Sequence, residues 1–191
     1  LSWGERVMGL TINEFYGQTE CNLLVGCCAQ VMEIRPGSMG RAIPGRIVEI
    51  LDEKGQLVPP GTVGEIAVKR PDPVMFIEYW KNPEATQSKF IGDWLLTGDM
   101  ASQDEEGYFW FKGRTDDVIT SSGYRMGPTE IEECLMKHPA VGMVAVVGIP
   151  DPDRTEIVKA FIVLNPDQSP SPELESDIRS FVKTRLAAHE Y

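Results

Sequence analysis

The sequence has no hydrophobic run that approaches the roughly 20 residues needed to cross a bilayer as a helix. Its first residues lack a basic segment followed by an apolar one, so no signal peptide is predicted. An initiator methionine is also absent, and residues 1–17 resemble the end of a helix followed by a buried strand. These absences predict no membrane span, and they favour a piece of a longer protein.

Basic residues are scarce as well. The chain has 18 lysines and arginines against 29 aspartates and glutamates, which gives a formal net charge of −11. This balance argues against a nucleic-acid partner, because a phosphate backbone binds to a basic face. A small anionic ligand can still bind where a few cations are concentrated in one cleft. Arg114, Arg125 and Arg154 are the candidates.

Cysteine and histidine are few, with four and two residues respectively. Cys27 and Cys28 are adjacent and no histidine lies near them, so the sequence shows no metal-binding spacing. We expect reduced, mostly buried thiols in a cytosol-like compartment, with Cys27 and Cys28 packed in a core. An organelle matrix is the alternative location if a transit peptide precedes the chain.

The most informative stretch covers residues 108–133, where a predicted strand leads through a glycine-rich loop into a predicted helix. The loop, residues 120–127, carries several hydroxyl groups and Arg125, whose guanidinium can pair with a phosphate. Pro128 favours a helix start because its fixed φ suits the first turn. Taken alone, this pattern favours a polar hairpin loop with a surface arginine.

Hydrophobic patterning along the rest of the chain predicts a mixed α+β fold. Residues 7–15 are apolar with few charges, as in a strand inside an α/β sheet. Further strands are predicted in a small antiparallel subdomain and near the C-terminal end, at 46–51, 65–70, 141–149 and 156–164. Helices are predicted after the cap residue Asn82, at 128–137 and after the cap residue Ser171.

Four short polar segments need an interpretation, and two of them have both a chemical and a simpler one. Tyr16–Glu20 offers a glycine for close backbone approach and a carboxylate suited to Mg²⁺, or else only a turn with a solvated glutamate. Asp99, placed just after a predicted strand, can accept ribose hydroxyl groups or be a plain turn aspartate. The acidic turn Asp104–Gly107 is expected to be only solvated, and Arg154 to form an ion pair within its acidic loop.

Three motifs resemble those of the AMP-forming acyl-CoA synthetases, within the adenylate-forming enzyme superfamily. YGQTE at Tyr16–Glu20 is similar to the family's nucleotide motif, and LLTGD at Leu95–Asp99 to its ribose-binding motif. GRTDDVITSSGYRMGPTEIE, from Gly113 onward, is similar to its hinge-and-lid motif. The motifs follow the family's order over nearly the whole chain. The longer matches INEFYGQTE, RPGSMGRAIPG and SSGYRMGP most resemble the branch that acts on acetate or medium-chain fatty acids.

The resemblance implies three parts in the chain. Residues 1–34 would end a large AMP-binding domain with an α/β nucleotide-binding core, and residues 35–115 would form its small antiparallel, barrel-like subdomain. Residues 116–191 would form a compact α+β lid domain, itself truncated. Asp116 would be the hinge about which this lid turns between two half-reactions.

It also implies roles for individual residues. ATP or AMP would be bound by Glu14, Phe15, Tyr16, Gly17, Gln18, Thr19, Asp99 and Arg114. CoA would be bound by Ser122, Gly123, Tyr124, Arg125 and Arg154. Catalytic roles would belong to Thr19, Glu20 and Arg125, with Glu20 also holding the metal.

The implied reaction has two halves: a carboxylic acid is adenylated with ATP, and CoA thiolate then displaces AMP to give the thioester. The implied cofactors and substrates are ATP/AMP, Mg²⁺, a carboxylic acid and coenzyme A. The implied partners are thus small molecules and not nucleic acid, while a homo-oligomer is left open.

Two parts of the family pattern are expected outside this sequence, one upstream of Leu1 and one shortly after Tyr191, and a third part differs within it. It contains neither the Gly/Ser/Thr-rich phosphate loop with its lysine nor the Thr-Gly-Lys context of the lid lysine. Ala188–Glu190 stands where family members often carry Pro-Tyr-Lys, so a CoA contact by that lysine is not carried over. We therefore expect these 191 residues alone not to catalyse adenylation.

Two alternatives remain. One is a related adenylating enzyme, such as an aryl-CoA ligase or a peptide-synthetase adenylation domain. The other is a truncated binding or interaction module without catalysis.

Overall fold

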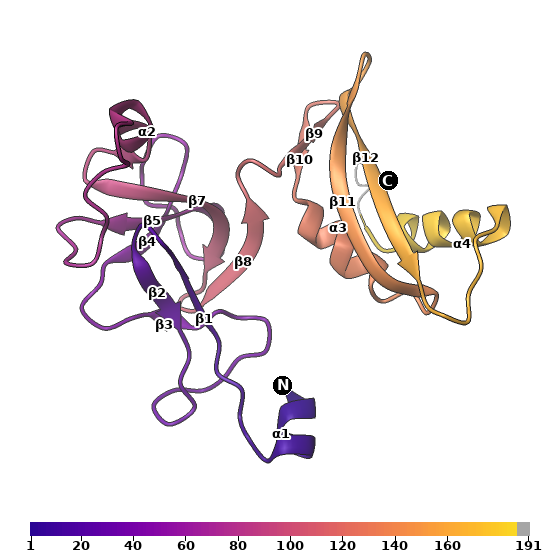
Figure 1. Cartoon of the computed structure of the whole chain (residues 1–191), viewed down its shortest axis with the longest axis horizontal. Coiled ribbons are helices and arrows are strands. Elements are labelled where there is room, and N and C mark those ends of the chain that lie inside the picture. The colour runs from indigo at the N-terminus through magenta and orange to yellow at the C-terminus, as the bar shows by residue number, and fades with distance from the viewer. Residues whose placement is uncertain (187–191) are drawn as a thin grey trace. The chain divides into compact units, whose positions relative to one another are not determined.

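The computed structural model describes residues 1–186, apart from the side chain of Arg125. The chain divides into two compact units, Leu1–Lys112 and Gly113–Tyr191 (Figure 1). Both units combine antiparallel strand pairs with short helices, which confirms the mixed α+β class. The domain boundary and hinge at Asp116 stay predictions.

The first unit holds a three-stranded sheet with the order β1-β2-β3 and a five-stranded sheet with the order β4-β5-β7-β6, in which β8 also pairs with β7. The edge strands β4 and β6 do not pair with each other, so the subdomain is an open sheet and not the barrel that the resemblance implied. The elements in chain order are α1 (Ser2–Met8), β1 (Phe15–Gln18), β2 (Asn22–Gly26), β3 (Arg41–Ala42), β4 (Val48–Leu51), β5 (Val63–Lys69), α2 (Pro83–Ser88), β6 (Phe90–Ile91), β7 (Trp94–Gln103) and β8 (Phe109–Arg114).

The buried strand predicted at residues 7–15 is wrong. Helix α1 extends to Met8 and ends at Gly9, whose left-handed φ of +64° caps it. Residues 10–14 have no strand partner within the described part of the chain, and Leu10 and Ile12 are exposed. Apolar composition alone could not show this, because a strand also needs a neighbour for its backbone hydrogen bonds.

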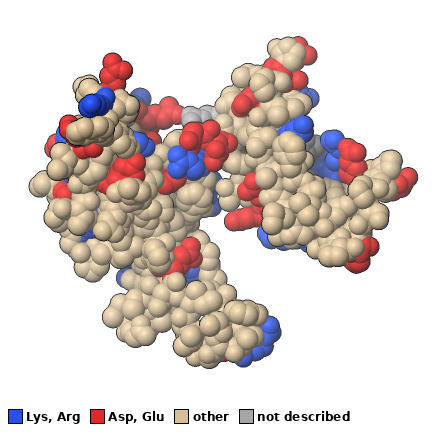
Figure 2. All heavy atoms as spheres, viewed as in Figure 1, with Lys and Arg blue, Asp and Glu red and all other residues tan. Residues whose placement is uncertain are grey.

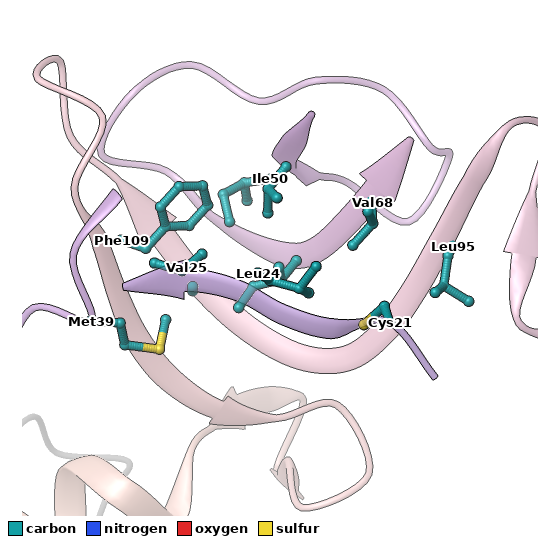
Figure 3. Close-up of a cluster of buried hydrophobic side chains, with 11 residues drawn as sticks. Cys21, Leu24, Val25, Met39, Ile50, Val68, Leu95 and Phe109 are labelled. Atoms are coloured by element: carbon teal, nitrogen blue, oxygen red, sulfur yellow. The ribbon is translucent and has the colours of Figure 1, made fainter. Parts of the chain in front are cut away.

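A single hydrophobic cluster joins the two sheets of the first unit. Figure 3 shows Leu24 and Val25 of β2 in the same cluster as Ile50, Val68 and Leu95 of the larger sheet. Cys21 from the turn between β1 and β2, Met39 from the segment before β3, and Phe109 of β8 complete it. Because all of these side chains are buried, the short β1–β2–β3 sheet is held firmly against the larger one.

The four cysteines differ in environment. Cys21 and Cys134 are buried, and burial raises the pKa of the Cys21 thiol to about 11. Cys27 and Cys28 are only partly buried, so the core packing expected for this pair is wrong. They follow β2 in a loop, where the Glu14 amide donates to Cys27 Sγ at 2.9 Å.

The acidic turn after β7 is more than solvated. Asp104 Oδ1 accepts hydrogen bonds from the amides of Glu106 and Tyr108 at 3.0 and 2.9 Å. Arg35 donates to Asp104 Oδ2 at 3.1 Å and to Glu106 Oε2 at 2.5 Å, and it stacks on the Tyr108 ring. Sequence reasoning missed this because Arg35 lies about 70 positions away, at separations of 69 and 71 residues.

The second unit contains one four-stranded sheet with the order β10-β9-β12-β11 and two helices packed on it. The strands and helices predicted for this region are confirmed to within about two residues at most ends. Its core includes Ile119, Ile131, Leu135, Val146 and Ile178. Its elements are β9 (Ile119–Ser121), β10 (Tyr124–Met126), α3 (Pro128–Leu135), β11 (Val141–Asp151), β12 (Thr155–Leu164) and α4 (Pro172–Lys183).

Two predicted helix caps are present as hydrogen bonds. Asn82 Oδ1 accepts from the amide of Ala85 at 3.1 Å at the start of α2. Ser171 Oγ accepts from the amide of Leu174 at 3.2 Å at the start of α4. Both helices have proline in the first turn, as the cap-plus-proline pattern indicated.

The surface on view in Figure 2 agrees with the acidic composition. Lysine and arginine side chains are scattered among aspartates and glutamates there, with no basic face. Within residues 1–186, no helix is both long enough and apolar enough to cross a bilayer.

Candidate nucleotide and CoA site

The predicted nucleotide motif lies within strand β1 and the turn after it, not beyond the end of a preceding strand. Successive side chains of a strand point to opposite faces, and burial here alternates accordingly. The half-buried set is Tyr16, Gln18 and Glu20, while the exposed set is Phe15, Gly17 and Thr19. One stretch of sequence thus presents two different surfaces.

Gly17 has a structural reason to be glycine. A Cβ at this position would lie 2.1 Å from the carbonyl oxygen of Asn22 on the neighbouring strand. Such a contact is impossible without moving the backbone, since β1 and β2 have a register irregularity here. The glycine is therefore required for strand pairing, independently of any ligand.

Asp99 lies inside β7 and not after the end of a strand, as the sequence suggested. Its residue is 6% exposed, and two side chains of β1 donate to the same carboxylate oxygen. Tyr16 Oη donates to Oδ2 at 2.6 Å, and Gln18 Nε2 donates to Oδ2 at 2.7 Å. The structure thus joins two predicted motifs that are 83 and 81 residues apart along the chain.

The Asp99 environment is further ordered by its neighbours. Gln18 Nε2 also donates to the carbonyl oxygen of Thr97 at 2.8 Å, and the Asp99 amide donates to Thr97 Oγ1 at 3.2 Å. Burial, followed by the hydrogen bond to Asp99, raises the pKa of Tyr16 well above its usual range. The phenol therefore stays protonated and remains a donor to the carboxylate.

Glu65 of β5 is a residue that sequence reasoning missed. Its Oε1 accepts a hydrogen bond from the amide of Gly98 at 2.7 Å, directly before Asp99. Burial raises the pKa of this carboxyl group. Gly98 has a φ of +81°, which a glycine adopts without strain. The hydrogen bond to Glu65 therefore fixes the backbone directly before Asp99.

Glu20 is held by the segment between β5 and α2. Tyr79 Oη donates to Glu20 Oε1 at 2.5 Å, and the Phe76 amide donates to the Glu20 carbonyl oxygen at 2.6 Å. The bond from Tyr79 lowers the pKa of Glu20, while burial and the same bond raise the pKa of Tyr79 to about 12. No sequence signal for Tyr79 was recognised, although it lies three residues before the helix cap Asn82.

A carboxylate such as Glu20 fits a particular kind of metal site. Within the described residues there is no group of three or more His, Cys, Asp or Glu side chains that could hold a metal ion. Mg²⁺ in nucleotide enzymes is often bound by one or two carboxylates together with substrate phosphates. Glu20 fits that arrangement as a single protein ligand, and it does not fit a closed protein cage.

The predicted CoA residues of the second unit come together at a hairpin. Ser122 and Gly123, with φ of +50° and +82°, form the turn between β9 and β10. The Ser122 amide donates to the carbonyl oxygen of Arg154 at 2.9 Å. A Cβ on Gly123 would meet open space, so this turn offers bare backbone next to Tyr124 and Arg154.

Arg154 does not form the ion pair expected within its loop. Asp151 Oδ1 accepts from the main-chain amides of Asp153 and Arg154, each at 2.9 Å. Within the described residues, the exposed Arg154 side chain has no carboxylate in salt-bridge range. The carboxylate of Asp151 is therefore hydrogen-bonded to main-chain amides of its own turn and not to the Arg154 side chain.

Arg114 and Asp116 were given separate roles, yet they are bonded to each other. Arg114 Nε donates to Asp116 Oδ1 at 2.8 Å, and Arg114 Nη2 donates to Oδ2 at 3.1 Å. This two-point pair bridges the chain just after β8, where the first unit gives way to the second. The main chain of Arg125 pairs with Thr120 across the β9–β10 hairpin. The Arg125 side chain lies outside the described part of the structure. The predicted departure from the family pattern at Ala188–Glu190 also lies outside it.

Two families of known proteins match parts of this chain. Residues 1–80 match the family AMP-binding enzyme, and residues 130–191 match the family AMP-binding enzyme C-terminal domain. The acetyl-coenzyme A synthetase of Bacillus subtilis (strain 168) is 46% identical over 190 residues, covering 99% of this chain and 33% of that protein. The mitochondrial acyl-coenzyme A synthetase ACSM3 of Rattus norvegicus is 50% identical over 188 residues, covering 96% of this chain and 32% of that protein.

Solved structures are similar over the same length. The anthranilate CoA ligase AuaEII in complex with anthranoyl-AMP has a TM-score of 0.84 and 35% identity, over 99% of this chain and 36% of that one. ATP-bound MatB from Rhodopseudomonas palustris has a TM-score of 0.87 and 33% identity, over 95% of this chain and 35% of that one.

The chain therefore belongs to the AMP-binding enzyme family, among the AMP-forming acyl-CoA synthetases, which confirms the resemblance drawn from its three motifs. It spans about a third of the length of the curated relatives it matches.

Proposed function

We propose that the protein carrying this chain is an acid–thiol ligase that adenylates a carboxylic acid with ATP and then transfers the acyl group to CoA. Acetate to medium-chain fatty acids are the proposed acids, since the similar curated relatives include an acetyl-coenzyme A synthetase and ACSM acyl-coenzyme A synthetases. The observation that carries the proposal is the buried Asp99 carboxylate with two donors from the nucleotide motif on one oxygen.

Asp99 is proposed to accept the ribose hydroxyl groups of ATP and AMP. A carboxylate fixed by Tyr16 and Gln18 loses little rotamer freedom when it accepts a further hydrogen bond, which favours binding. Glu14 and the exposed set Phe15, Gly17 and Thr19 are proposed to face the nucleotide as well. Arg114 is proposed as a further ribose contact.

Glu20 is proposed to be the protein ligand for Mg²⁺, and Thr19 and Arg125 to act with it on the phosphates. A bound Mg²⁺ would neutralise phosphate charge as it develops in adenylation. The chain's own contribution is an ionised carboxylate, held in place by Tyr79.

The hairpin turn of the second unit is proposed to receive CoA. Ser122, Gly123 and Tyr124 offer backbone and hydroxyl groups, and Arg154 offers a cation beside them. Asp116 is proposed as the hinge that presents this surface in the second half-reaction. A cytosolic or organelle-matrix location agrees with the absence of disulfides among the four cysteines.

The test is ligand titration of the chain, followed by NMR. AMP is expected to shift the amide signals around Tyr16, Gln18 and Asp99, and 2′,3′-dideoxy-AMP to bind more weakly. Asp99→Asn should abolish that difference, whereas Asp93→Asn, an exposed aspartate of the same unit, should preserve it. Equal binding of the two nucleotides by the unmodified chain would contradict the ribose assignment.

The complete enzyme separates the remaining alternatives. Thioester formation from acetate or hexanoate with free CoA, and without a carrier protein, supports the acyl-CoA synthetase. A requirement for an aromatic acid would favour an aryl-CoA ligase instead, and a requirement for a carrier protein would favour a peptide-synthetase domain.

A further inference from the structure

We infer that Tyr79 is a positioning residue for the nucleotide site: its hydroxyl fixes the Glu20 carboxylate in the orientation in which that group meets the metal-bound nucleotide. The inference rests on the proposed function of Glu20. Tyr79 belongs to none of the three motifs, and it lies 59 residues from Glu20 in the sequence.

The geometry joins Glu20 to the Tyr79 segment at two points. The Tyr79 hydroxyl meets Glu20 Oε1 at 2.5 Å, and the Phe76 amide meets the Glu20 carbonyl oxygen at 2.6 Å. Glu20 itself lies in a turn outside the strand ladder, where a side chain is otherwise free to change rotamer. The pair of bonds fixes both the main chain and the carboxylate of this one residue.

Tyr79 is in turn held by helix α2. Its amide donates to Thr86 Oγ1 at 2.9 Å, and Thr86 Oγ1 donates to the carbonyl oxygen of Asn82 at 3.0 Å. The Tyr79 ring lies 4.8 Å from the Phe76 ring, which stacks on Phe90 at 6.0 Å. Ring packing therefore sets where the hydroxyl points, before any ligand arrives.

Helix α2 lies outside the hydrophobic core of the unit. It is six residues long, and none of its residues is buried, so it adds little to the core. Its Thr86 hydroxyl instead accepts from the Tyr79 amide, and the Tyr79 hydroxyl donates to Glu20. This places a line of contacts from the cap of α2 to the proposed metal ligand.

Carboxylates that hold metal ions are commonly oriented by a further hydrogen bond, and loss of that bond typically costs 10–100-fold in metal affinity or activity. Tyr79→Phe removes only the hydroxyl and keeps the ring against Phe76. The matched control is Tyr108→Phe, because the Tyr108 hydroxyl donates at 2.9 Å to the Glu33 carbonyl oxygen and not to a carboxylate. Glu20→Gln serves as the reference for complete loss of the charged ligand.

The experiment measures Mn²⁺ binding in the presence of ATP by electron paramagnetic resonance, and metal-free AMP binding by calorimetry. We expect Tyr79→Phe to weaken Mn²⁺ binding about 10–100-fold while AMP affinity stays within about twofold. Tyr108→Phe should change neither quantity. In the complete enzyme, Tyr79→Phe should correspondingly raise the Mg²⁺ concentration needed for ATP–pyrophosphate exchange.

Every other result overturns the inference. Unchanged Mn²⁺ affinity in Tyr79→Phe shows that the hydroxyl does not position Glu20, and an equal loss of Mn²⁺ and AMP affinity shows a merely structural role. If the chain binds AMP through Asp99 but Glu20→Gln leaves Mn²⁺ binding unchanged, or the unmodified chain binds no Mn²⁺, the metal role fails while the ribose assignment stands. If Asp99→Asn also has no effect on AMP, the proposed function itself fails.

Discussion

Replacing Tyr16 by phenylalanine removes one hydroxyl group and leaves the aromatic ring in place. In the structure this hydroxyl donates to Asp99 Oδ2 at 2.6 Å, and Gln18 Nε2 donates to the same oxygen at 2.7 Å. The substitution therefore deprives a buried carboxylate of one of two donors on that oxygen. Its effect on the free energy of unfolding depends on how well the remaining hydrogen bond from Gln18 compensates for the lost one.

A hydrogen bond to a charged group contributes about 1.5–3 kcal/mol to stability. Because Gln18 still donates to Asp99 in the variant, we expect the lower end of this range, about 1.5 kcal/mol, at pH 8. The ring of Tyr16 packs against the core cluster in both proteins, so no cavity term is added.

The difference should depend on pH with a defined sign. The pKa of Tyr16 is raised in the folded state, first by burial and then by its bond to Asp99. Below about pH 10 the phenol is neutral in both states, so the full stabilisation is present. Above that pH the unfolded chain loses the proton while the folded one keeps it, so the native protein loses about 1.4 kcal/mol per pH unit. Tyr16→Phe lacks this loss, and the two proteins should have equal stability near pH 11.

Urea unfolding followed by tryptophan fluorescence measures this difference in the free energy of unfolding of the first unit. All four tryptophans, at positions 3, 80, 94 and 110, lie in the first unit, so their signal reports its unfolding alone. Other titrating groups are common to both proteins and cancel in the comparison. Tyr108→Phe provides the cost of losing a hydroxyl that donates to a neutral carbonyl.

Two results would refute the reasoning. A difference that stays constant from pH 8 to pH 11 would show that the folded phenol is not held in its neutral form. No difference at pH 8, with an unchanged urea slope, would show that the bond to Asp99 contributes nothing to stability.

Three further predictions concern the second unit and the activity of the chain. Ile131→Ala should destabilise the second unit by about 2–5 kcal/mol, because the side chain is 2% exposed; hydrogen exchange of the β11 amides measures it, and unchanged exchange contradicts it. Ser171→Ala should cost about 1 kcal/mol through loss of the α4 cap, seen as faster exchange at Leu174, whereas Ser171→Asp should retain the protection. The 191 residues alone should show no carboxylate-dependent ATP–pyrophosphate exchange, and any exchange that Asp99→Asn reduces would disprove this.

Local patterns in the sequence were reliable where the physics is local. Asn82 and Ser171 cap their helices because a side-chain oxygen and a nearby amide are enough to start a helix. The strands near 141–149 and 156–164 follow from their nearly continuous apolar residues, and they pair along nearly their whole length. These features could be predicted because every interacting partner lies within a few residues or in an adjacent strand.

The prediction failed where an element depends on distant partners. Residues 7–15 have the composition of a buried strand, but within the described chain the segment 10–14 has no strand beside it. Asp104 was expected to be solvated, yet it binds Arg35 and the amides of its own turn. Cys27 and Cys28 are apolar enough for a core but follow β2 into a loop. In each case the composition of a segment is compatible with either a buried or an exposed position, and long-range contacts decide which of the two it takes.

The motifs in the sequence determined by themselves that this chain belongs to the adenylate-forming enzymes, because YGQTE, LLTGD and the hinge-and-lid stretch occur in the family's order. Only the tertiary structure decided which side chains of those motifs face each other. It joined Tyr16 and Gln18 of β1 to Asp99, and it joined Glu20, in the turn after β1, to Tyr79 outside every motif. The physical reason is that a hydrogen bond is set by distance and direction in space, and residues 59 to 83 positions apart acquire these only when the sheets pack.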